Sequence, residues 1–192
     1  MPSEGPDPSR RNERSRRAIL DEVVNLIGEV GYARASVEEL ARRAGVGKQT
    51  VYRWWPSMGA VVLEAITERS ASVVPFADTG DLVADLRTQM MSVIDLFTTR
   101  FGAVYRALIA AAQSDNALSQ AHLDQYIFPA TVDCRQRFET AIERGEIRGD
   151  IDIQATIDLL YGAIYYRLVL QTRPLDPAQI DAALDIVVRG LK

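Results

Sequence analysis

Apolar side chains recur along this chain with the three-to-four-residue spacing of an α-helix, and no stretch shows the alternation of a half-buried strand. Within the first sixty residues, Val23 and Val30 belong to an apolar face that Gly31 closes. After a loop at 74–80, marked by Pro, Asp and Gly, the same spacing continues. It predicts helices at 82–97, 101–112, 117–127, 129–144, 153–171 and 176–191. We therefore expect an all-α fold.

Residues 36–55 predict two short helices joined by a turn that contains glycine. Ser36 is a suitable helix N-cap, and Glu39, three residues later, can complete a capping box with it. Gly45 stands where a left-handed residue usually ends a helix, and Gly47 opens the second one. The apolar stripe of the first helix consists of Val37, Leu40, Ala41 and Ala44. Cap, turn and stripe together predict a helix-turn-helix.

The second of these helices has an inner and an outer face. At about 100° per residue, Val51, Trp55 and the stem of Lys48 fall on the inner face. Gln49 and Arg53 point outward, and side chains of these two types can make bidentate contacts with base edges in a major groove. Neighbouring hydroxyl and amine groups suit DNA phosphates. The predicted DNA-binding residues are Ser36, Lys48, Gln49, Thr50, Tyr52, Arg53, Trp54 and Arg14.

These residues also carry a family resemblance. The run at 50–57 (TVYRWWPS), with Leu40-Ala41 before it, resembles the DNA-binding domain of tetracycline-repressor (TetR) type regulators, and the resemblance covers residues 14–63. It implies an all-helical homodimer whose larger second domain binds a small effector. One position departs from the pattern. Met58 stands where the family commonly has a lysine, and this removes a cation expected to meet a phosphate.

Three parts of the chain are predicted. Residues 1–12, with three prolines and a glycine, are expected to form a disordered tail. Residues 13–56 are expected to form the helix-turn-helix DNA-binding domain. Residues 57–192 are expected to form a helical domain for effector binding and dimerisation. Ser57 can cap a connector helix at 57–73, at the start of that second domain.

The net charge of −4 hides an uneven distribution. Residues 1–60 contain 10 Lys and Arg against 8 Asp and Glu, and the rest of the chain contains 12 against 18. Positive charge gathers just before the helix-turn-helix, where we favour phosphate contacts over a merely solvated arm. This cluster consists of Arg10, Arg11, Arg14, Arg16 and Arg17.

Composition argues against several other functions. No run of about 18 apolar residues predicts a membrane span, and the polar N-terminal segment lacks an apolar signal core, so we expect a cytoplasmic protein. His122 and Cys134 are the only residues of their types, too few for a closed transition-metal site. Cys134 is expected to be a small buried side chain rather than a redox sensor. With Asp124 nearby, a Cys-His pair is a weak catalytic signal. We expect no enzyme, metal or cofactor.

A ligand pocket is implied by the resemblance rather than by any single residue. Small-molecule cavities combine apolar and aromatic walls with a few hydroxyl groups, and the second half of the chain offers such side chains. The same spacing also fits an ordinary core. The predicted lining residues are Met90, Ile94, Phe97, Phe101, Tyr105, Tyr126 and Tyr161.

The helix predicted at 153–171 has almost no polar face, so it must be covered on more than one side. It could be the central helix of a single domain. We favour a helix that faces its own core on one side and a second subunit on the other, packed with the helix at 129–144. In the resembled family, these two helices build a four-helix dimer interface. The predicted interface residues are Phe138, Ile142, Tyr165 and Leu168.

The sequence thus predicts a homodimeric transcription regulator that binds double-stranded DNA. We expect a repressor that a small hydrophobic effector releases from a palindromic operator. Two alternatives stay open. One is an activator or an effector-independent DNA binder. The other is a ligand-binding or interaction protein that keeps the helix-turn-helix only as a scaffold, against which the outward set of Gln49, Thr50 and Arg53 speaks.

Overall fold

The computed structural model describes residues 8–73 and 76–191, and every regular element in these ranges is a helix. The N-terminal elements are α1 (Pro8–Val30), the 3-10 turn η1 (Tyr32–Arg34), α2 (Val37–Arg43), α3 (Lys48–Trp54) and α4 (Met58–Val73). The C-terminal elements are α5 (Leu82–Thr98), α6 (Arg100–Ala112), α7 (Asn116–His122), η2 (Leu123–Ile127), α8 (Phe128–Glu143), α9 (Ile153–Leu170) and α10 (Pro177–Leu191). The predicted all-α fold class is confirmed.

Helix α1 begins earlier than the sequence predicted. Of the predicted tail at 1–12, residues 1–7 lie outside the described part of the chain, and residues 8–12 belong to α1, so for these the prediction is wrong. The segment contains Arg10 and Arg11, and Arg is a good helix former, while Pro8 is compatible with the first helical position. In addition, Asn12 Oδ1 accepts a hydrogen bond from Arg53 Nη2 of α3 (3.3 Å). The tertiary contact thus helps to hold an extra turn.

Several predicted helix ends are confirmed. The Asp152 side chain accepts a hydrogen bond from the N–H of Ala155 (3.0 Å) at the start of α9. The Asp176 side chain likewise accepts one from the N–H of Gln179 (3.0 Å) at the start of α10. Gly145 ends α8 with a φ of 71°, a left-handed conformation that glycine adopts without steric cost. Such local hydrogen bonds set where these helices begin and end.

One boundary between predicted helices does not exist. The segments predicted at 117–127 and 129–144 join into one helical run formed by α7, η2 and α8. Its middle part, η2, is a π-helix, which has a wider turn than an α-helix and is often found at functional sites. Pro129 does not break the run, because it directly follows residues where the α-helical hydrogen-bond ladder is already altered.

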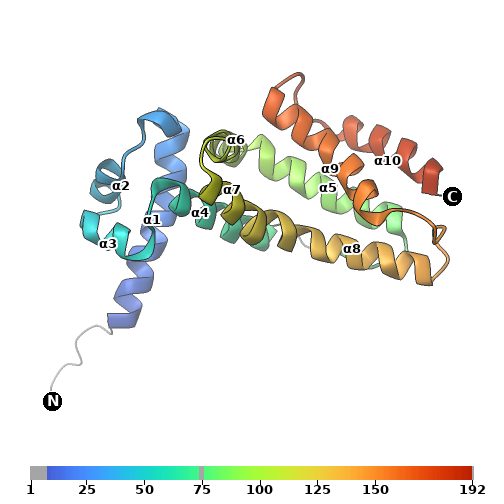
Figure 1. Ribbon diagram of the computed structural model, residues 1–192, viewed down its shortest axis with the longest axis horizontal. Coiled ribbons are helices and arrows are strands. Elements are labelled where there is room, and N and C mark those ends of the chain that lie inside the picture. Colours follow the sequence, from blue (N-terminus) through green and yellow to red (C-terminus); the bar gives the residue numbers. More distant parts are fainter. Residues whose placement is uncertain (1–7, 74–75, 192) are drawn as a thin grey trace, which may run out of the picture.

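The helices form an elongated molecule (Figure 1). Helices α1–α3 lie at one end, α9 and α10 lie toward the other, and α4 leads from the first part into the second. Helix α1 packs against α4 and α6, and α4 also contacts α6 and α7. The buried apolar side chains of both parts belong to one continuous core. None of the described helices is both long and apolar enough to span a bilayer.

A buried ion cluster holds α8 against α5. The guanidinium of Arg137 on α8 is 2% exposed and pairs with Asp85 of α5 (2.8 Å) and with Glu146 (2.9 Å). Asp85 also accepts a hydrogen bond from the Thr79 hydroxyl (2.6 Å) in the loop before α5. Charges taken out of water must be paired and hydrogen-bonded, so these groups fix the relative position of the two helices.

Candidate nucleic-acid interface and ligand cavity

The two helices of the motif begin and end where the sequence predicts. The Ser36 hydroxyl oxygen accepts a hydrogen bond from the N–H of Glu39 (3.2 Å), which caps α2. The predicted capping box is only half formed, because the Glu39 carboxylate binds Arg42 and Arg43 instead. Gly45 has a φ of 67°, the left-handed conformation expected at this turn. Backbone chemistry close in sequence therefore places α3 relative to α2.

The inner face of α3 packs into the core and is joined to α4. Val51 and Trp55 are buried, as predicted. The Trp55 Nε1–H donates a hydrogen bond to Glu64 Oε2 on α4 (2.6 Å). The same carboxyl group pairs with Arg16 of α1. Glu64 therefore connects α1, the C-terminal end of α3 and α4.

The outer face of α3 presents polar and aromatic groups to the surroundings. Gln49, Tyr52, Arg53 and Trp54 are exposed, and Thr50 is half-buried. The Arg53 guanidinium lies 5.9 Å from the centre of the Trp54 ring. These side chains stand on successive turns of one short helix, which is how a helix-turn-helix offers side chains to a major groove.

Two of the predicted DNA-contacting cations have partners within the chain. Lys48 Nζ binds the Glu38 carboxylate of α2 and lies 5.5 Å from the centre of the Tyr52 ring. Its side chain is 48% exposed, so the prediction that its stem lies on the inner face is wrong. Arg53 is hydrogen-bonded to Asn12. Contacts of either cation with DNA must replace or add to these interactions.

The basic cluster on α1 divides into two kinds of side chain. Arg14 is exposed and faces the surroundings. Arg16 is half-buried and binds two carboxylates of α4, Glu64 and Glu68, so it fastens α1 to α4. The side chains of residues 10–11 lie outside the described part of the chain. Proximity in sequence therefore overestimated the charge available to DNA.

The start of α4 lies in close contact with both parts of the molecule. The Ser57 hydroxyl caps it by accepting a hydrogen bond from the N–H of Ala60 (3.2 Å). Met58, which replaces the lysine common in the resembled family, is half-buried and packs against the core. A Cβ added at Gly59 would lie 2.7 Å from Leu118 Cδ2 of α7, so α4 and α7 pack closely here and a larger residue would displace the Leu118 side chain.

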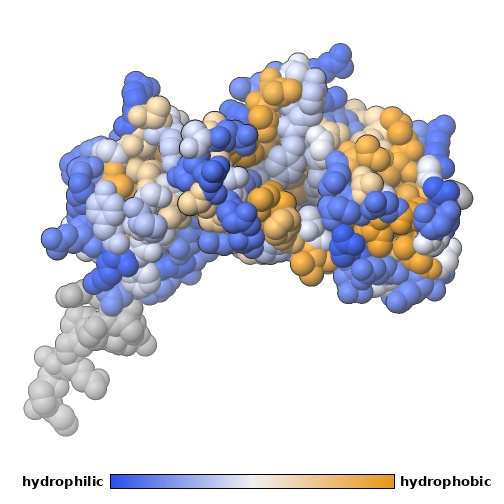
Figure 2. Space-filling view, in the orientation of Figure 1, coloured by the Kyte–Doolittle hydropathy of each residue, from blue (hydrophilic) through white to orange (hydrophobic). Residues whose placement is uncertain are grey.

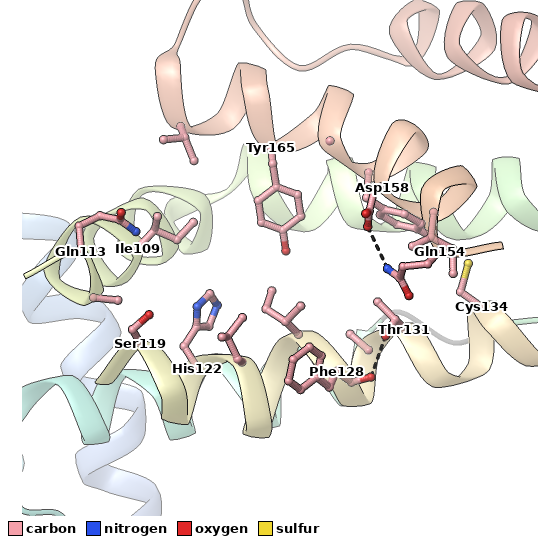
Figure 3. Close-up of a pocket in the computed structure, with 18 of the residues that line it drawn as sticks. Ile109, Gln113, Ser119, His122, Phe128, Thr131, Cys134, Gln154, Asp158 and Tyr165 are labelled. Carbon is pink, nitrogen blue, oxygen red and sulfur yellow. Dashed lines mark hydrogen bonds between the residues drawn. The ribbon is translucent and has the colours of Figure 1, made fainter. Parts of the chain in front are cut away.

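A cavity of about 650 Å³ lies between α6, the α7–η2–α8 run and α9 (Figure 3). Most of its wall is apolar, and polar groups gather toward two ends. Gln113 and Ser119 lie toward one end, and Gln154 and Asp158 toward the other. The ring of Tyr165 points into the space between them. A concave apolar site with a few polar groups is the usual form of a small-molecule pocket.

Behind the cavity wall lies a hydrogen-bonded network. The Tyr105 hydroxyl is 2.9 Å from His122 Nε2 and 2.9 Å from the Tyr165 hydroxyl. His122 and Tyr165 line the cavity, whereas Tyr105 is fully buried. Burial lowers the pKa of His122 and raises the pKa of Tyr105 and of Tyr165. All three groups are therefore neutral near pH 7, and each can donate or accept a hydrogen bond.

The network reaches α4 through the π-helix. The ring of Tyr126, in η2, lies 5.1 Å from the Tyr105 ring and 5.7 Å from the His122 ring, measured between ring centres. The Tyr126 hydroxyl accepts a hydrogen bond from the hydroxyl of Ser70 on α4 (3.2 Å). Tyr126 thus connects the cavity wall to α4, the helix that leads to the helix-turn-helix.

The structure places most of the predicted pocket residues elsewhere. Of the predicted set, only Tyr161 lines this cavity, and its hydroxyl donates a hydrogen bond to Gln89. The remaining residues of the set, which lie in or against the core, are Met90, Ile94, Phe97, Phe101, Tyr105 and Tyr126. Helical spacing identifies an apolar face but cannot tell whether it meets another helix or a cavity. One available signal was missed: Gln154 and Asp158 are polar residues four apart in the first half of a helix that is mostly apolar.

The predicted interface residues also lie on other sides of their helices. Phe138 and Leu168 are buried within the subunit, so they cannot form an interface between folded subunits. Tyr165 lines the cavity, and Ile142 is half-buried. When a helix has no polar face, its sequence cannot show which side packs within the subunit and which side could face a partner.

Helix α9 nevertheless exposes an apolar stripe. Leu159 is 67% exposed, and Tyr166 and Leu170 are each 59% exposed. These residues share one side of the helix, because their spacing of seven and four residues follows the helical repeat. Figure 2 shows that hydrophobic residues gather over the half of the molecule that holds α8–α10. Exposed apolar side chains gathered on one side of a helix are typical of an interaction site.

Helix α10 extends this surface. The Gln179 Nε2 donates a hydrogen bond to the carbonyl oxygen of Ala163 on α9 (2.5 Å), so this side of α10 faces α9. Ile186, two turns later on the same side, is 72% exposed. We call the combined surface of Leu159, Tyr166, Leu170 and Ile186 the α9–α10 face. This face spans α9 and α10, whereas the sequence predicts an interface that combines the helix at 153–171 with the helix at 129–144.

The weak catalytic signal has no geometric support among the described residues. His122 is engaged with Tyr105, and Asp124 is exposed and accepts a hydrogen bond from Gln120 (3.0 Å). Cys134 is buried, as expected, and burial raises the pKa of its thiol to about 12, so the thiol stays protonated. No three His, Cys, Asp or Glu side chains of the described ranges cluster closely enough to hold a metal ion.

Comparison with known proteins agrees with this geometry. Residues 19–65 match the family described as bacterial regulatory proteins, tetR family, and residues 76–187 match the family described as tetracyclin repressor-like, C-terminal domain. The HTH-type transcriptional regulator YdeS of Bacillus subtilis is 34% identical over 182 residues, which are 95% of this chain and 90% of YdeS. The DNA-binding transcriptional repressor TetR of Mycobacteroides abscessus is 28% identical over 182 residues, 93% of this chain and 94% of that protein.

A solved structure is also similar over almost the whole chain. The TetR family transcription regulator SCO0332 has a TM-score of 0.78 and 35% sequence identity, covering 93% of this chain and 99% of that one. The chain therefore belongs to the TetR family of helix-turn-helix transcriptional regulators. Members of this family bind DNA and small-molecule effectors and act as dimers.

Proposed function

We propose that this regulator is a homodimeric repressor that leaves a palindromic operator when a small, largely apolar molecule enters the cavity. One observation carries the proposal: contacts run without a break from the cavity wall to α3. His122 packs against Tyr126, which is hydrogen-bonded to Ser70 of α4. Farther along α4, Glu64 is hydrogen-bonded to Trp55 at the end of α3.

The same contacts supply the mechanism. A ligand that displaces His122 or Tyr165 changes the support of Tyr126 and hence of α4. Helix α3 then moves with α4. Two helix-turn-helix units of a dimer fit successive major grooves only if they stand about 34–36 Å apart, so a small rotation of each α4 is enough to disfavour the bound state. The ligand shifts the equilibrium by its differential affinity for the two states.

In this proposal, different residues of the helix-turn-helix and of α1 contact the DNA bases and the DNA backbone. Gln49 and Arg53 read base edges, and Thr50 and Trp54 lie against the adjoining sugar and base surfaces. Contacts with phosphates come from Ser36, Lys48, Tyr52 and Arg14. The exposure of Gln49, Tyr52, Arg53 and Arg14 and the capping of α2 at Ser36 support this division.

The proposed dimer forms through the α9–α10 face. Two copies related by a two-fold axis would pack α9 and α10 of each subunit into a four-helix bundle. Burial of Leu159, Tyr166 and Ile186 would remove large apolar groups from water, which is the main driving force of such association. A two-fold protein in turn requires an operator with matching symmetry.

A gel shift tests the proposal directly. The protein is titrated onto the intergenic DNA upstream of its own gene, with an excess of random competitor DNA. A specific complex is expected for the native protein but not for the Gln49→Ala, Arg53→Ala double variant. Failure to form any specific complex would favour the scaffold alternative. A complex that persists when a compound demonstrably fills the cavity would point to an effector-independent DNA binder.

A further inference from the structure

The cavity wall carries very little charge. Among the described residues that line it, Asp158 of α9 is the only one with a formal charge at neutral pH, and none is Lys or Arg. His122 adds no positive charge, because burial lowers its pKa. The other polar lining groups are amides and hydroxyls, which can bind neutral or charged ligand atoms alike.

The surroundings of Asp158 leave its carboxylate available to a ligand. Gln154 Nε2 donates a hydrogen bond to Asp158 Oδ1 (2.9 Å), and Gln154 Oε1 accepts one from Arg135 Nη2 (2.7 Å). The guanidinium of Arg135 therefore binds the Gln154 amide rather than Asp158, and Arg135 does not line the cavity. Asp158 is exposed, at the end of the cavity that Gln154 shares (Figure 3).

This arrangement distinguishes ligands by their charge. An anion that enters the cavity loses water, finds no lining cation and meets the carboxylate of Asp158, so its desolvation is not compensated. A cation can pair with that carboxylate. It can also lie over aromatic rings, which the wall provides at Phe128, Tyr161 and Tyr165.

We propose that the cavity selects organic cations: a protonated or quaternary amine on an apolar body that contains an aromatic ring. The charged end lies at Asp158, and the body lies along Tyr161 and Tyr165 toward Ile109. The inference rests on the proposed role of the cavity as the effector site, and it names the class of effector.

Three compounds with one bicyclic body and different charges test the selection. Isothermal titration calorimetry at pH 7 compares 1-naphthylmethylamine, which is protonated, with neutral 1-naphthalenemethanol and anionic 1-naphthoate. The amine is expected to bind about three- to tenfold more tightly than the alcohol, because a partly exposed ion pair and a cation–π contact each contribute modestly. The naphthoate is expected to bind at least about tenfold more weakly than the alcohol.

Two isosteric substitutions assign the effect to one carboxylate. Asp158→Asn should reduce the affinity for the amine to that for the alcohol and leave the affinity for the alcohol unchanged. Asp133→Asn removes the same charge from an exposed position on α8 that does not line the cavity, and it should leave the order of the three ligands intact. An unchanged affinity for the alcohol in both variants also shows that the cavity has kept its shape.

Equal binding of all three compounds, tighter binding of the naphthoate, or no measurable binding of any of them would overturn charge selection. So would an unaltered preference for the amine in Asp158→Asn. None of these results touches the gel shift of the ligand-free protein, which tests the proposed function separately. Loss of the DNA complex combined with the expected ligand order would instead reject the regulator proposal and keep the selectivity of the cavity.

Discussion

Single residues on α3 should determine which DNA sequence the protein prefers. Arg53→Ala is expected to weaken binding to the specific operator by about 1–3 kcal/mol, the cost of losing a bidentate base contact, and to affect random DNA less. Arg42→Ala is a matched control, since it removes the same charge from α2, where the side chain is 70% exposed. It should weaken binding to both DNAs to a similar extent. Fluorescence anisotropy with both duplexes gives the comparison, and equal losses for Arg53→Ala would contradict base readout.

A second residue-scale prediction concerns the buried Arg137. Its replacement by methionine keeps much of the volume but leaves Asp85 without its cation and Glu146 with only the more distant Arg144 (3.9 Å). Breaking a buried ion pair in this way should lower the free energy of unfolding by about 3–5 kcal/mol at pH 7. Urea unfolding measures it, at one fixed protein concentration because dimerisation contributes to stability.

The loss caused by Arg137→Met should depend on pH. Burial favours a higher pKa for Asp85, but hydrogen bonds from Thr79 and Arg137 outweigh it and hold that pKa below its usual value. The hydrogen bond from Arg137 likewise lowers the pKa of Glu146. The stabilisation is therefore complete above the unfolded pKa values of about 3.9 and 4.3, and it is lost as the pH falls through the lower folded values.

Without Arg137, burial leaves both carboxyl groups easier to protonate, so the destabilisation by Arg137→Met should shrink between pH 7 and pH 4. Arg87→Met serves as the control, because Arg87 forms its ion pair with Asp181 (2.7 Å) at the exposed surface, outside this cluster. It should cause only a small loss at either pH. A loss for Arg137→Met that stays constant over this range would show that the cluster does not contribute through its charges.

At the scale of elements, the contact between η2 and α4 should carry the signal from the cavity. Tyr126→Phe keeps the ring contacts with Tyr105 and His122 and removes the hydrogen bond to Ser70. With 1-naphthylmethylamine as the cavity ligand, the ratio of DNA affinities without and with ligand should fall by about two- to tenfold, as expected for one hydrogen bond. DNA affinity without ligand should change little.

Ser70→Ala should have the same effect as Tyr126→Phe, and the double variant should be no worse than either single one, because both remove the same bond. Ser92→Ala on α5 removes a hydroxyl that bonds only within its own helix, to the Thr88 carbonyl oxygen (3.1 Å), and it should leave the ratio unchanged. Additive effects of the two η2–α4 variants would indicate that the signal travels by another route.

At the scale of the whole molecule, the α9–α10 face should determine assembly. Tyr166→Glu and Ile186→Glu each place an unpaired charge in the proposed interface. Because the dimer is two-fold symmetric, each substitution buries two such charges, one from each subunit, so sedimentation should detect monomers. Val132→Glu is the control: Val132 is 61% exposed on α8, outside this face, and the dimer should persist. Monomers from Val132→Glu alone would restore the pairing of α8 with α9 that the sequence had suggested.

Much of the helix-turn-helix could be predicted from its own residues. The cap at Ser36, the left-handed turn at Gly45 and the buried Val51 all depend on contacts between neighbours in sequence or on the helical repeat. Such interactions join residues three or four apart, so the sequence states them almost directly. For the same reason, the helix caps at Asp152 and Asp176 could be predicted without knowledge of the tertiary structure.

The tertiary structure decided what each apolar side chain faces. Tyr105, Tyr161 and Tyr166 are aromatic residues on helices with equally apolar patterns, yet one is buried, one lines the cavity and one is exposed. The tertiary structure also pairs Arg16 with Glu64, which lies far along the chain. Arg16 is therefore engaged within the protein, although the sequence predicts that it contacts a DNA phosphate. A cavity is the space that several elements leave between them, and an interface is the surface that they leave uncovered. Both depend on how whole helices pack, which no local pattern of residues contains.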